Sequence, residues 1–448
     1  MLKTAEEHVR AGRLAQAIDT CYAILSAQPN HPGALHLAGV IAHQLDESEE
    51  AVALIDQAIR IDPRRAVYHV NRGIALHRLG RHREALASFA RAIAADPRHV
   101  DAHYNRGAVL AELGELDEAK RHFERVIALE PQHAFAHYAL GLAFLQQGDF
   151  ARGWAEHEWR RRGAKLTPDK LVFREPLWDG RPLGGRTILL HAEQGLGDTI
   201  QFVRYAPLVA ERGGRVLLAC QPSLKRLLSR LDGVEAVLTG GDRLPTFDVQ
   251  APLMSLPYLL GTTVETIPAQ IPYLGIDHEL AARWAERLRD TPGLKVGLVW
   301  AGNPTNPHDR RRSMALANLA PLAAFAEQDV SLISLQKGPA GAEAATPPDG
   351  LRLIDLGPEL TDLADTAALV AQLDLVISVD TAVAHLAGAL GRPVWLLVSH
   401  VHDWRWLLGR NATPWYPSMR LFHQSRPGDW QSVVSSVCTA LHASIRTS

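Results

Sequence analysis

The feature that most constrains the fold of this chain is a strict 34-residue period over its first third. Four series of residues keep that spacing in phase: Pro29, Pro63, Pro97 and Pro131; Gly39, Gly73, Gly107 and Gly141; Gly80, Gly114 and Gly148; Ala17, Ala51, Ala85 and Ala119. A period of this length predicts small units that cannot bury their apolar faces alone. Neighbouring units must therefore stack on one another.

Each period is expected to form two helices. Apolar residues in 70–79 recur at helical spacing. Gly73 allows two helices to approach closely, Gly80 ends the first helix in a left-handed conformation, and Pro97 ends the second. This pattern resembles the tetratricopeptide repeat over residues 1–160. The resemblance implies a right-handed superhelix with a concave groove, whose first repeat lacks the start of its first helix and whose last deviates in its second.

Two asparagines are candidates for acceptor binding in that groove. Asn71 and Asn105 occupy the same repeat position, which Leu37 and Ala139 hold in the flanking repeats. In the O-linked N-acetylglucosamine transferases, which carry similar repeats, asparagines at this position bind extended peptide. An amide offers a donor and an acceptor to any peptide group. The alternative is that both asparagines simply face solvent.

Charge and cysteine content exclude several classes of protein. Lys and Arg number 47 against 49 Asp and Glu, so no global field favours DNA or anionic lipid. The three cysteines are far apart, which disfavours a disulfide scaffold and a cysteine-zinc site. The first residues lack the apolar core of a signal peptide, and no run of 18 apolar residues occurs. We therefore expect a soluble, cytoplasmic protein without membrane insertion.

The second half changes to alternating strands and helices. We expect strands at 187–191, 215–220, 247–252, 295–302, 331–336, 351–356, 373–380 and 393–398. Continuous apolar strands between helices indicate parallel sheets covered on both faces. Two series joined near 268–292 predict two Rossmann-like domains facing a cleft, with ligands at the carboxyl ends of the strands.

The first motif in this half, HAEQGLGDTIQF, spans 191–202. Gly195 and Gly197 turn the chain between a strand and a helix, and let the backbone approach a ligand. It is neither a P-loop nor a dinucleotide fingerprint, since the Walker lysine and GxGxxG are absent. Asp198 is either functional or an ordinary helix cap.

A second motif, ISVDTAVAHLAGALGRP, spans 377–393 and brings a strand to the start of a helix. Free N–H groups at that start would bind an anion beside Asp380 and Thr381. His385 lies on the same helix face and could add a donor. The alternative is a capped helix with a packed histidine.

A third motif, at 300–313, places Arg310, Arg311 and Arg312 after the first strand of the second series. Arginine complements phosphate oxygens, although a solvated basic loop is equally compatible with the sequence. The loop at 334–338, with Gln336 and Lys337, also ends a strand and could touch a nucleotide.

Residues 186–425 resemble the heptosyltransferase-type superfamily, glycosyltransferase family nine, which has the two-domain GT-B fold. The resemblance lies in GLGDT and SVDTAVAHLAGALGRP. The EWR at 158–160 and the tail DWRWLLGRNATPWYP resemble bacterial repeat-containing glycosyltransferases, some of which are implicated in flagellin glycosylation. The predicted organisation is repeats at 1–162, a linker at 163–184, an acceptor-side domain at 185–275 and a nucleotide-sugar domain at 276–448.

The resemblance also implies roles. Asp198 would be the general base on the acceptor hydroxyl, and the segment from Asp380 through Thr381 to His385 would hold the donor diphosphate. One arginine of 310–312 would replace the family's phosphate-binding lysine.

The implied reaction is metal-independent inverting transfer from a nucleotide sugar to a protein hydroxyl. The nucleotide sugar is a substrate, and no cofactor or metal is expected. Two alternatives remain: a repeat scaffold with a degenerate, non-catalytic transferase domain, and a lipopolysaccharide heptosyltransferase, against which the repeats argue.

Two further groups are expected to be structural. His133 and His137 are spaced for metal binding but lack the glutamate of HExxH, so a surface position is favoured. The aromatic residues Trp404, Trp406, Trp415 and Tyr416 are expected to pack in the core, with stacking on a sugar or base as the alternative. The helix expected at 430–445 could return to the first domain.

Overall fold

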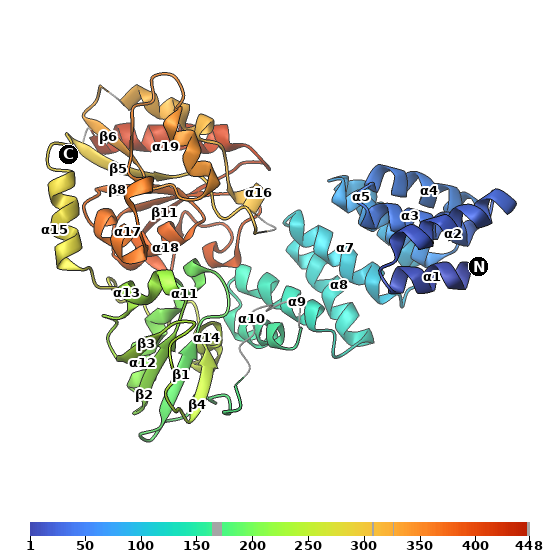
Figure 1. Ribbon diagram of the computed structural model, residues 1–448, viewed down its shortest axis with the longest axis horizontal. Helices are drawn as coiled ribbons and strands as arrows, with labels where there is room; N and C mark the ends of the chain where they lie inside the picture. Colours follow the sequence, from blue (N-terminus) through green and yellow to red (C-terminus); the bar gives the residue numbers. More distant parts are fainter. Residues whose placement is uncertain (164–172, 307–308, 326, 446–448) are drawn as a thin grey trace. The chain divides into compact units, whose positions relative to one another are not determined.

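The structure is a computed structural model that describes residues 1–163, 173–306, 309–325 and 327–445. The chain divides into two compact units, Met1–Ala143 and Phe144–Ser448 (Figure 1). Residues 164–172 of the expected linker lie outside the described residues.

The first unit consists of antiparallel helix pairs. Its helices are α1 (Leu2–Arg10), α2 (Leu14–Ala27), α3 (Pro32–Gln44), α4 (Ser48–Ile61), α5 (Ala66–Arg78), α6 (His82–Ala95), α7 (Val100–Glu112), α8 (Leu116–Leu129) and the start of α9 (Ala134–Gln146). The first helix of a pair has 13 residues in α3, α5 and α7, whereas α1 has 9. The shortened first repeat is therefore confirmed.

Glycines have two structural roles in the repeats. A Cβ on Gly73 would lie 2.5 Å from the ring of Phe89, so glycine is needed where α6 packs on α5. Gly80 ends α5 with φ +73°, and Gly114 ends α7 with φ +82°. The predicted left-handed helix ends are confirmed; Asp46 takes the same position, with φ 69°, after α3.

A histidine in the first helix of three successive pairs fixes the entry to that helix. The Nε2 atoms of His69, His103 and His137 lie 2.8, 3.2 and 3.1 Å from the carbonyl oxygens of Pro63, Pro97 and Pro131. His137 is therefore buried, and its expected surface position is wrong. His133 accepts a hydrogen bond from the Ala136 N–H at 3.1 Å, so the two histidines have separate structural tasks.

The second unit begins with the end of α9, the short helix α10 (Phe150–His157) and a 3-10 turn, η1 (Glu158–Arg161). With 8 residues, α10 is shorter than the 14-residue second helices of the repeats, as expected for a deviating last repeat. The indole of Trp154 donates to the Thr262 carbonyl at 3.0 Å. Arg160 is fully buried and pairs with Glu158 and Glu193, so the EWR segment anchors this hairpin within the second unit.

The first sheet of this unit has four parallel strands: β1 (Thr187–His191), β2 (Arg215–Ala219), β3 (Val234–Leu238) and β4 (Val249–Pro252). Short helices connect them: α11 (Leu196–Phe202), α12 (Ala206–Ala210), α13 (Lys225–Leu228) and α14 (Leu256–Leu259). The strand order is β3-β2-β1-β4.

The second sheet has seven strands: β5 (Leu294–Val299), β6 (Val330–Ser334), β7 (Leu353–Asp355), β8 (Leu375–Val379), β9 (Val394–Val398), β10 (Ala412–Thr413) and β11 (Tyr416–His423). Its helices are α15 (His278–Arg287), α16 (Asp309–Arg312), α17 (Leu363–Val370), α18 (Ala382–Ala389) and α19 (Trp430–Ile445). All pairings are parallel except that of β10 with β11. The sequence prediction missed β3, β10 and β11.

The strand orders confirm two Rossmann-like halves (Figure 1). Apart from the edge strand β10, the second sheet runs β11-β9-β8-β5-β6-β7, the doubly wound order in which direction reverses between its first and fourth strands. Those strands are β5 and β8; the equivalent pair in the first sheet is β1 and β4. In such sheets ligands bind where the order reverses, beyond the carboxyl ends of the strands.

The carboxyl-terminal helix belongs to the core of the second sheet. Val433, Val437 and Leu441 of α19 are buried in one apolar cluster with Val296 of β5 and Leu332 of β6. The expectation that this helix returns to the first domain is therefore wrong, because its apolar face is already covered by the seven-stranded half.

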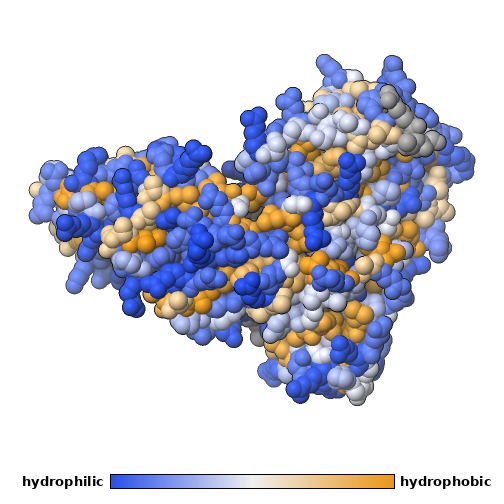
Figure 2. Space-filling model, turned by 180° about the vertical axis from the view of Figure 1, so that it is seen from behind, coloured by the Kyte–Doolittle hydropathy of each residue, from blue (hydrophilic) through white to orange (hydrophobic). Residues whose placement is uncertain are grey.

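Polar side chains cover much of the face seen in Figure 2, with apolar side chains showing between them. Large exposed apolar side chains include Tyr22, Ile61 and Tyr258, and some exposed apolar residues are normal for a protein surface. Within the described ranges, no helix combines the length and apolarity needed to cross a membrane.

Candidate active site

The predicted site residues follow the strands that flank the two reversal points. Gly195, Gly197 and Asp198 come after β1, Arg310 and Arg312 after β5, and the segment 380–385 after β8. Strand order and sequence motifs thus indicate the same region of the second unit.

The start of α11 uses one oxygen of Asp198 for structure. Gly195 precedes the helix in an extended conformation, and its N–H donates to Asp198 Oδ2 at 2.9 Å. This is the reciprocal half of a capping box, so the structural alternative is correct for one of the two oxygens. The other oxygen, Oδ1, is paired with the Arg405 guanidinium.

The start of α18 is open to an anion. Thr381 precedes the helix, and among the described residues no side chain caps its first turn. The Thr381 hydroxyl instead lies 3.0 Å from the Ser378 hydroxyl. The Ala384 N–H donates to the Thr381 carbonyl at 3.1 Å, so the N–H groups of Ala382 and Val383 keep their hydrogen-bonding capacity. The positive end of the helix dipole there favours negative charge.

The two helix starts meet directly. A Cβ on Gly197 would lie 2.9 Å from Cδ2 of His385 and 3.6 Å from Cα of Ala382. A side chain at 197 would therefore push α11 away from α18. The structure thus brings the motif after β1 and the motif after β8 into contact, although they are far apart in the sequence.

Arg405 is bonded to the first motif and acts electrostatically on Asp380 and His385 of the second, and the sequence analysis gave it no role. It lies in a 3-10 turn (Trp404–Trp406) and is buried. Its guanidinium pairs with Asp198, with Asp403 at 2.8 Å, and with the side chain of Gln201. The sequence signal that could have pointed to Arg405 is its position inside the aromatic run DWRW. Such a run is expected to be buried, and a buried cation requires anionic partners.

Asp380 has an unusual protonation equilibrium. Burial, and to a lesser degree the nearby carboxylate of Asp403, raise its pKa, which lies at about 6. The Trp406 indole, which donates to Asp380 Oδ2 at 3.0 Å, acts in the opposite direction, as do the charges of Arg312 and Arg405. Asp380 can therefore gain or lose a proton near neutral pH.

His385 is neutral. Burial, and to a lesser degree the charge of Arg405, lower its pKa to about 3. Its Nε2 lies 3.8 Å from Asp380 Oδ1, but a neutral imidazole makes no ion pair there. Its Nδ1 lies 2.9 Å from the Tyr416 hydroxyl, so the ring is held by hydrogen bonding and packing.

The loop after β5 supplies the basic groups. Arg312 Nε lies 3.2 Å from Asp309 Oδ1, and its side chain is one-quarter exposed. Its electrostatic effect on Asp380 and His385 places its charge near the start of α18. The Arg310 side chain is exposed. Residues 307–308 of this motif lie outside the described residues.

Gln336 and Lys337 face the backbone. Gln336 Oε1 accepts from the N–H groups of Trp300 and Ala301, both at 2.9 Å, and its Nε2 donates to the Ala301 carbonyl. Gln336 therefore braces the loop that leads to Arg312. Lys337 Nζ donates to the carbonyls of Gly357 and Leu360. In this arrangement neither side chain has its polar head directed at the α11–α18 junction.

A second buried arginine supports the same junction. Arg204 donates to the Trp415 carbonyl at 2.8 Å and to the Tyr273 hydroxyl at 3.1 Å, and lies 4.7 Å from the ring centre of Tyr416. Trp404, Trp406, Trp415 and Tyr416 are all buried. Their expected packing role is confirmed.

The two asparagines of the first unit lie in successive first helices. Asn71 Nδ2 is 2.7 Å from His36 Nε2, and Asn105 Nδ2 donates to the Asp101 carbonyl at 2.8 Å. Both are half-buried. Both of these hydrogen bonds use the amide nitrogen and not the amide oxygen.

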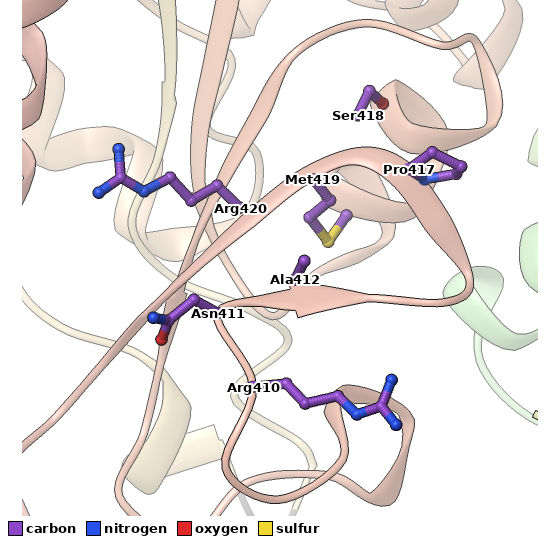
Figure 3. Close-up of a pocket in the computed structure, with 7 residues that line it drawn as sticks. All are labelled: Arg410, Asn411, Ala412, Pro417, Ser418, Met419 and Arg420. Atoms are coloured by element: carbon purple, nitrogen blue, oxygen red, sulfur yellow. The ribbon is translucent and has the colours of Figure 1, made fainter.

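A pocket of about 670 Å³ lies elsewhere in the second unit (Figure 3). It is formed by the β10–β11 hairpin and lined by Arg410, Met419 and Arg420, among others. None of its lining residues was predicted as a site residue, and it contributes nothing to the α11–α18 junction.

Comparison with known families agrees with both halves of this description. Tetratricopeptide repeat families match residues 8–70 and 70–120, and a TPR repeat family matches 109–148. Glycosyltransferase family 9 (heptosyltransferase) matches residues 322–398, which include the start of α18 but not Asp198. The chain thus joins tetratricopeptide repeats to a domain of the family 9 glycosyltransferase type.

Individual relatives share parts of the chain. Protein FlbA of Caulobacter vibrioides is 30% identical over 323 residues, which cover 66% of this chain and 53% of that protein. The chain therefore spans about half the length of this relative. Among solved structures, MamA gives a TM-score of 0.33 at 22% identity, covering 37% of this chain and 97% of its own. YrrB, described as a TPR protein with an unusual peptide-binding site, gives 0.31 at 23%, covering 38% and 85%.

Proposed function

We propose that the protein transfers a sugar from a nucleotide-sugar donor to a hydroxyl group of a protein acceptor. The observation that carries this proposal is the contact between the starts of α11 and α18, which brings the helix that carries Asp198 in one Rossmann-like half against the uncapped helix start of the other. Transfer needs those two elements together: a base for the incoming hydroxyl and an electrostatic partner for the leaving phosphate.

The donor diphosphate is proposed to bind at the first turn of α18. The free N–H groups there and the charge of Arg312 would stabilise the negative charge that develops on the leaving group. The match of family 9 glycosyltransferases to this segment supports the assignment. Backbone N–H groups and arginine can do this without a metal ion.

Asp198 is proposed as the general base. As the acceptor oxygen bonds to the anomeric carbon, the bond from that carbon to the phosphate oxygen breaks, and Asp198 takes the hydroxyl proton. Direct displacement inverts the anomeric centre. Arg405 orients the carboxylate through its pair with Oδ1, while Gly195 holds the other oxygen. The base must therefore exchange one of these partners for the acceptor hydroxyl.

A protein acceptor fits the repeats better than a lipid or oligosaccharide does. Asn71 and Asn105 carry amides at equivalent positions of α5 and α7, and an amide offers a donor and an acceptor to a peptide group. Flagellin is the acceptor suggested by the resemblance to bacterial repeat-containing transferases, and the cytoplasm is the proposed place of action.

The test begins with the donor. UDP-, GDP-, CMP- and ADP-sugars are screened by thermal shift, and intact mass then reports sugar addition to co-expressed acceptors, beginning with flagellin. Asp198→Asn should bind the donor and fail to transfer. Asp232→Asn, an exposed aspartate in the same half, is the control and should transfer normally. Equal transfer by both variants would refute the base.

The acceptor is tested separately. Asn71→Ala combined with Asn105→Ala should raise KM for a protein acceptor and leave slow donor hydrolysis unchanged. An unchanged KM would exclude these asparagines as the acceptor reader. Donor binding without transfer to any acceptor would instead favour a scaffold with a non-catalytic transferase domain.

A further inference from the structure

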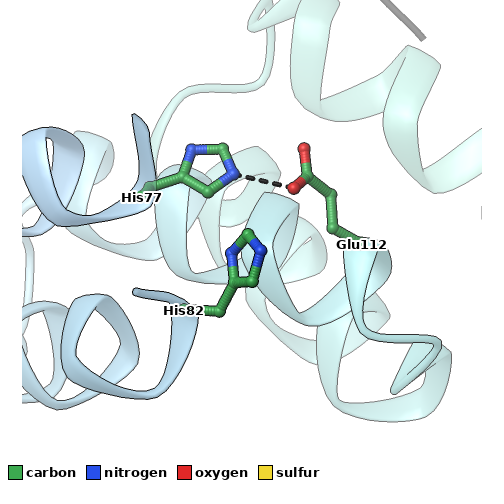
Figure 4. A group of neighbouring side chains, drawn as sticks. All are labelled: His77, His82 and Glu112. Atoms are coloured by element: carbon green, nitrogen blue, oxygen red, sulfur yellow. Dashed lines mark hydrogen bonds and ion pairs between the residues drawn. The ribbon is translucent and has the colours of Figure 1, made fainter. Parts of the chain in front are cut away.

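A cluster of metal-binding side chains lies in the first unit, outside the proposed transfer site. His77 lies in the last turn of α5, His82 is the first residue of α6, and Glu112 is the last residue of α7. One potential ligand atom from each lies within 4.8 Å of the other two. Figure 4 shows the two rings and the carboxylate converging on one space.

The distances within the cluster suit a small cation. His77 Nε2 is 2.7 Å from Glu112 Oε2, and the two imidazole centres are 5.4 Å apart. Zinc binds imidazole nitrogen and carboxylate oxygen at about 2.0–2.2 Å, so ligand atoms around one ion lie roughly 3–3.5 Å apart. Small side-chain rotations would close the trio to that spacing while the helices stay in place.

The preceding pair of repeats provides an internal comparison. The positions 34 residues earlier carry His43, Ser48 and Arg78. There His43 Nδ1 lies 3.1 Å from the Ser48 hydroxyl, and Arg78 pairs with Asp46. A guanidinium at the third position repels a cation. The same scaffold keeps a histidine at the first position but carries Ser48 and Arg78 at the other two, so the complete set of His, His and Glu is specific to one interface.

The following interface lacks the ligands as well. The first two positions there are Ala111 and Leu116. Within the described part of the chain, His77, His82 and Glu112 are the group of three or more potential ligands that meets this spacing. The trio is half-buried, so an ion would be partly shielded while keeping access to a water ligand.

We propose that His77, His82 and Glu112 bind a Zn²⁺ ion, with water as the fourth ligand. Two imidazoles and a carboxylate form a ligand set that zinc accepts in four-coordinate sites. The ion would replace the hydrogen bond between His77 and Glu112 with two stronger links. The sequence analysis expected no metal for sugar transfer, and this site is separate from that reaction.

The consequence for the repeats follows from which helices the ion joins. His77 ends α5, which carries Asn71, and Glu112 ends α7, which carries Asn105. A metal held by both helices would fix their spacing. The two asparagines would then be presented at a defined distance, which lowers the entropic cost of binding an extended segment.

The test uses the full chain, without a histidine tag and freed of metal by chelation. Zn²⁺ is titrated by calorimetry, and Co²⁺ is added to the same protein to read visible absorption typical of four-coordinate sites. The variants are His82→Ser, which copies the residue of the preceding repeat, and Glu112→Gln, which keeps the side-chain shape. His278→Ser, an exposed histidine in the second unit, is the matched control.

Wild type and His278→Ser should each bind one equivalent of Zn²⁺ with a rise in Tm. His82→Ser and Glu112→Gln should bind roughly tenfold more weakly or not at all, and far-UV circular dichroism should show unchanged helix content. Absence of a stoichiometric site in wild type, or equal affinity in all four proteins, would overturn the proposal.

Discussion

The repeats and the α11–α18 junction are specified in opposite ways. In the repeats, each structural device recurs: the glycine under an aromatic ring at Gly73 is found again at Gly107 against Phe123. At the junction each device occurs once, as in the pair between Asp198 and Arg405. A feature that recurs in every repeat can be recognised in the sequence, and the fold tolerates its loss in one repeat. A site assembled from single, distant residues should instead fail when one of them is replaced.

The largest effect is expected where the junction has no duplicate. Asp198→Asn keeps the size of the side chain and an oxygen for the Gly195 N–H, but removes the base. The rate of sugar transfer should fall about 10²–10⁴-fold, with donor affinity changed by only a few-fold. Single-turnover kinetics and donor titration measure the two quantities. A loss of donor affinity as large as the loss of transfer rate would show that Asp198 binds the donor and does not act as the base.

A large loss of stability should follow from Arg405→Met. The change leaves the carboxylates of Asp198 and Asp403, which are 21% and 37% exposed, without the buried guanidinium that they share. Breaking a fully buried ion pair on one side costs about 3–5 kcal/mol, and the loss here should be smaller because water reaches both carboxylates. Urea unfolding gives the free energy of unfolding. The control, Arg426→Met, removes an arginine that is 82% exposed and should change the free energy of unfolding by less than about 1 kcal/mol. Equal losses in both variants would mean that the ion pairs of Arg405 do not stabilise the fold.

Asp380 should make stability depend on pH. Its pKa is raised by burial from an ordinary 3.8 to about 6, so the folded protein holds a proton that the unfolded chain has released. Its contribution is present below about pH 4 and lost as pH rises through 6. Asp380→Asn, which keeps an acceptor for Trp406, should therefore stabilise the protein relative to wild type more at pH 7 than at pH 4.

The difference should be about 1–3 kcal/mol, from about 1.4 kcal/mol per unit of pKa shift. Comparing variant with wild type at each pH cancels the opposite contribution of His385, whose pKa is lowered to about 3 by burial. Denaturant midpoints at several pH values measure it. A difference that is constant with pH would show that Asp380 titrates normally.

A smaller loss is expected from crowding in one repeat. Gly73→Ala places a methyl group 2.5 Å from the ring of Phe89, and overpacking of this kind costs about 1–3 kcal/mol. Adding Phe89→Leu should restore part of that loss by making room. Thermal unfolding of both variants is the measurement, and a double variant that is less stable than the simple sum of both losses would argue against crowding.

The smallest effect is expected at a helix end. Gly80 has φ +73°, and a Cβ at this position would meet no atom within 4 Å, so Gly80→Ala adds backbone strain without crowding. The cost of a left-handed residue is about 1 kcal/mol. Because Asp46 already occupies the equivalent position, Gly80→Asn should lose less stability than Gly80→Ala. The reverse order would show that side-chain volume, not φ, decides.

How much the sequence predicts follows the same division. The helix pairs of the first unit and most strands of the second were predictable, because the 34-residue period and apolar runs are local signals. Strand β3 was missed because its residues are half-exposed. Helix α19 was placed wrongly because the apolar face of a helix does not show in the sequence which sheet it packs against. The motif after β8 was found, but Arg405 was not: its partner Asp198 is 207 residues away.

Amide hydrogen exchange of the full chain with and without a bound nucleoside diphosphate tests the central claim most directly. The nucleotide used is the one selected by the donor screen. We predict slower exchange at the start of α18 (Ala382–Ala389) and in the segment 195–202 of α11, with unchanged exchange in the first unit. Saturating nucleotide that slows exchange elsewhere and leaves both helix starts unchanged would contradict the proposed transfer site.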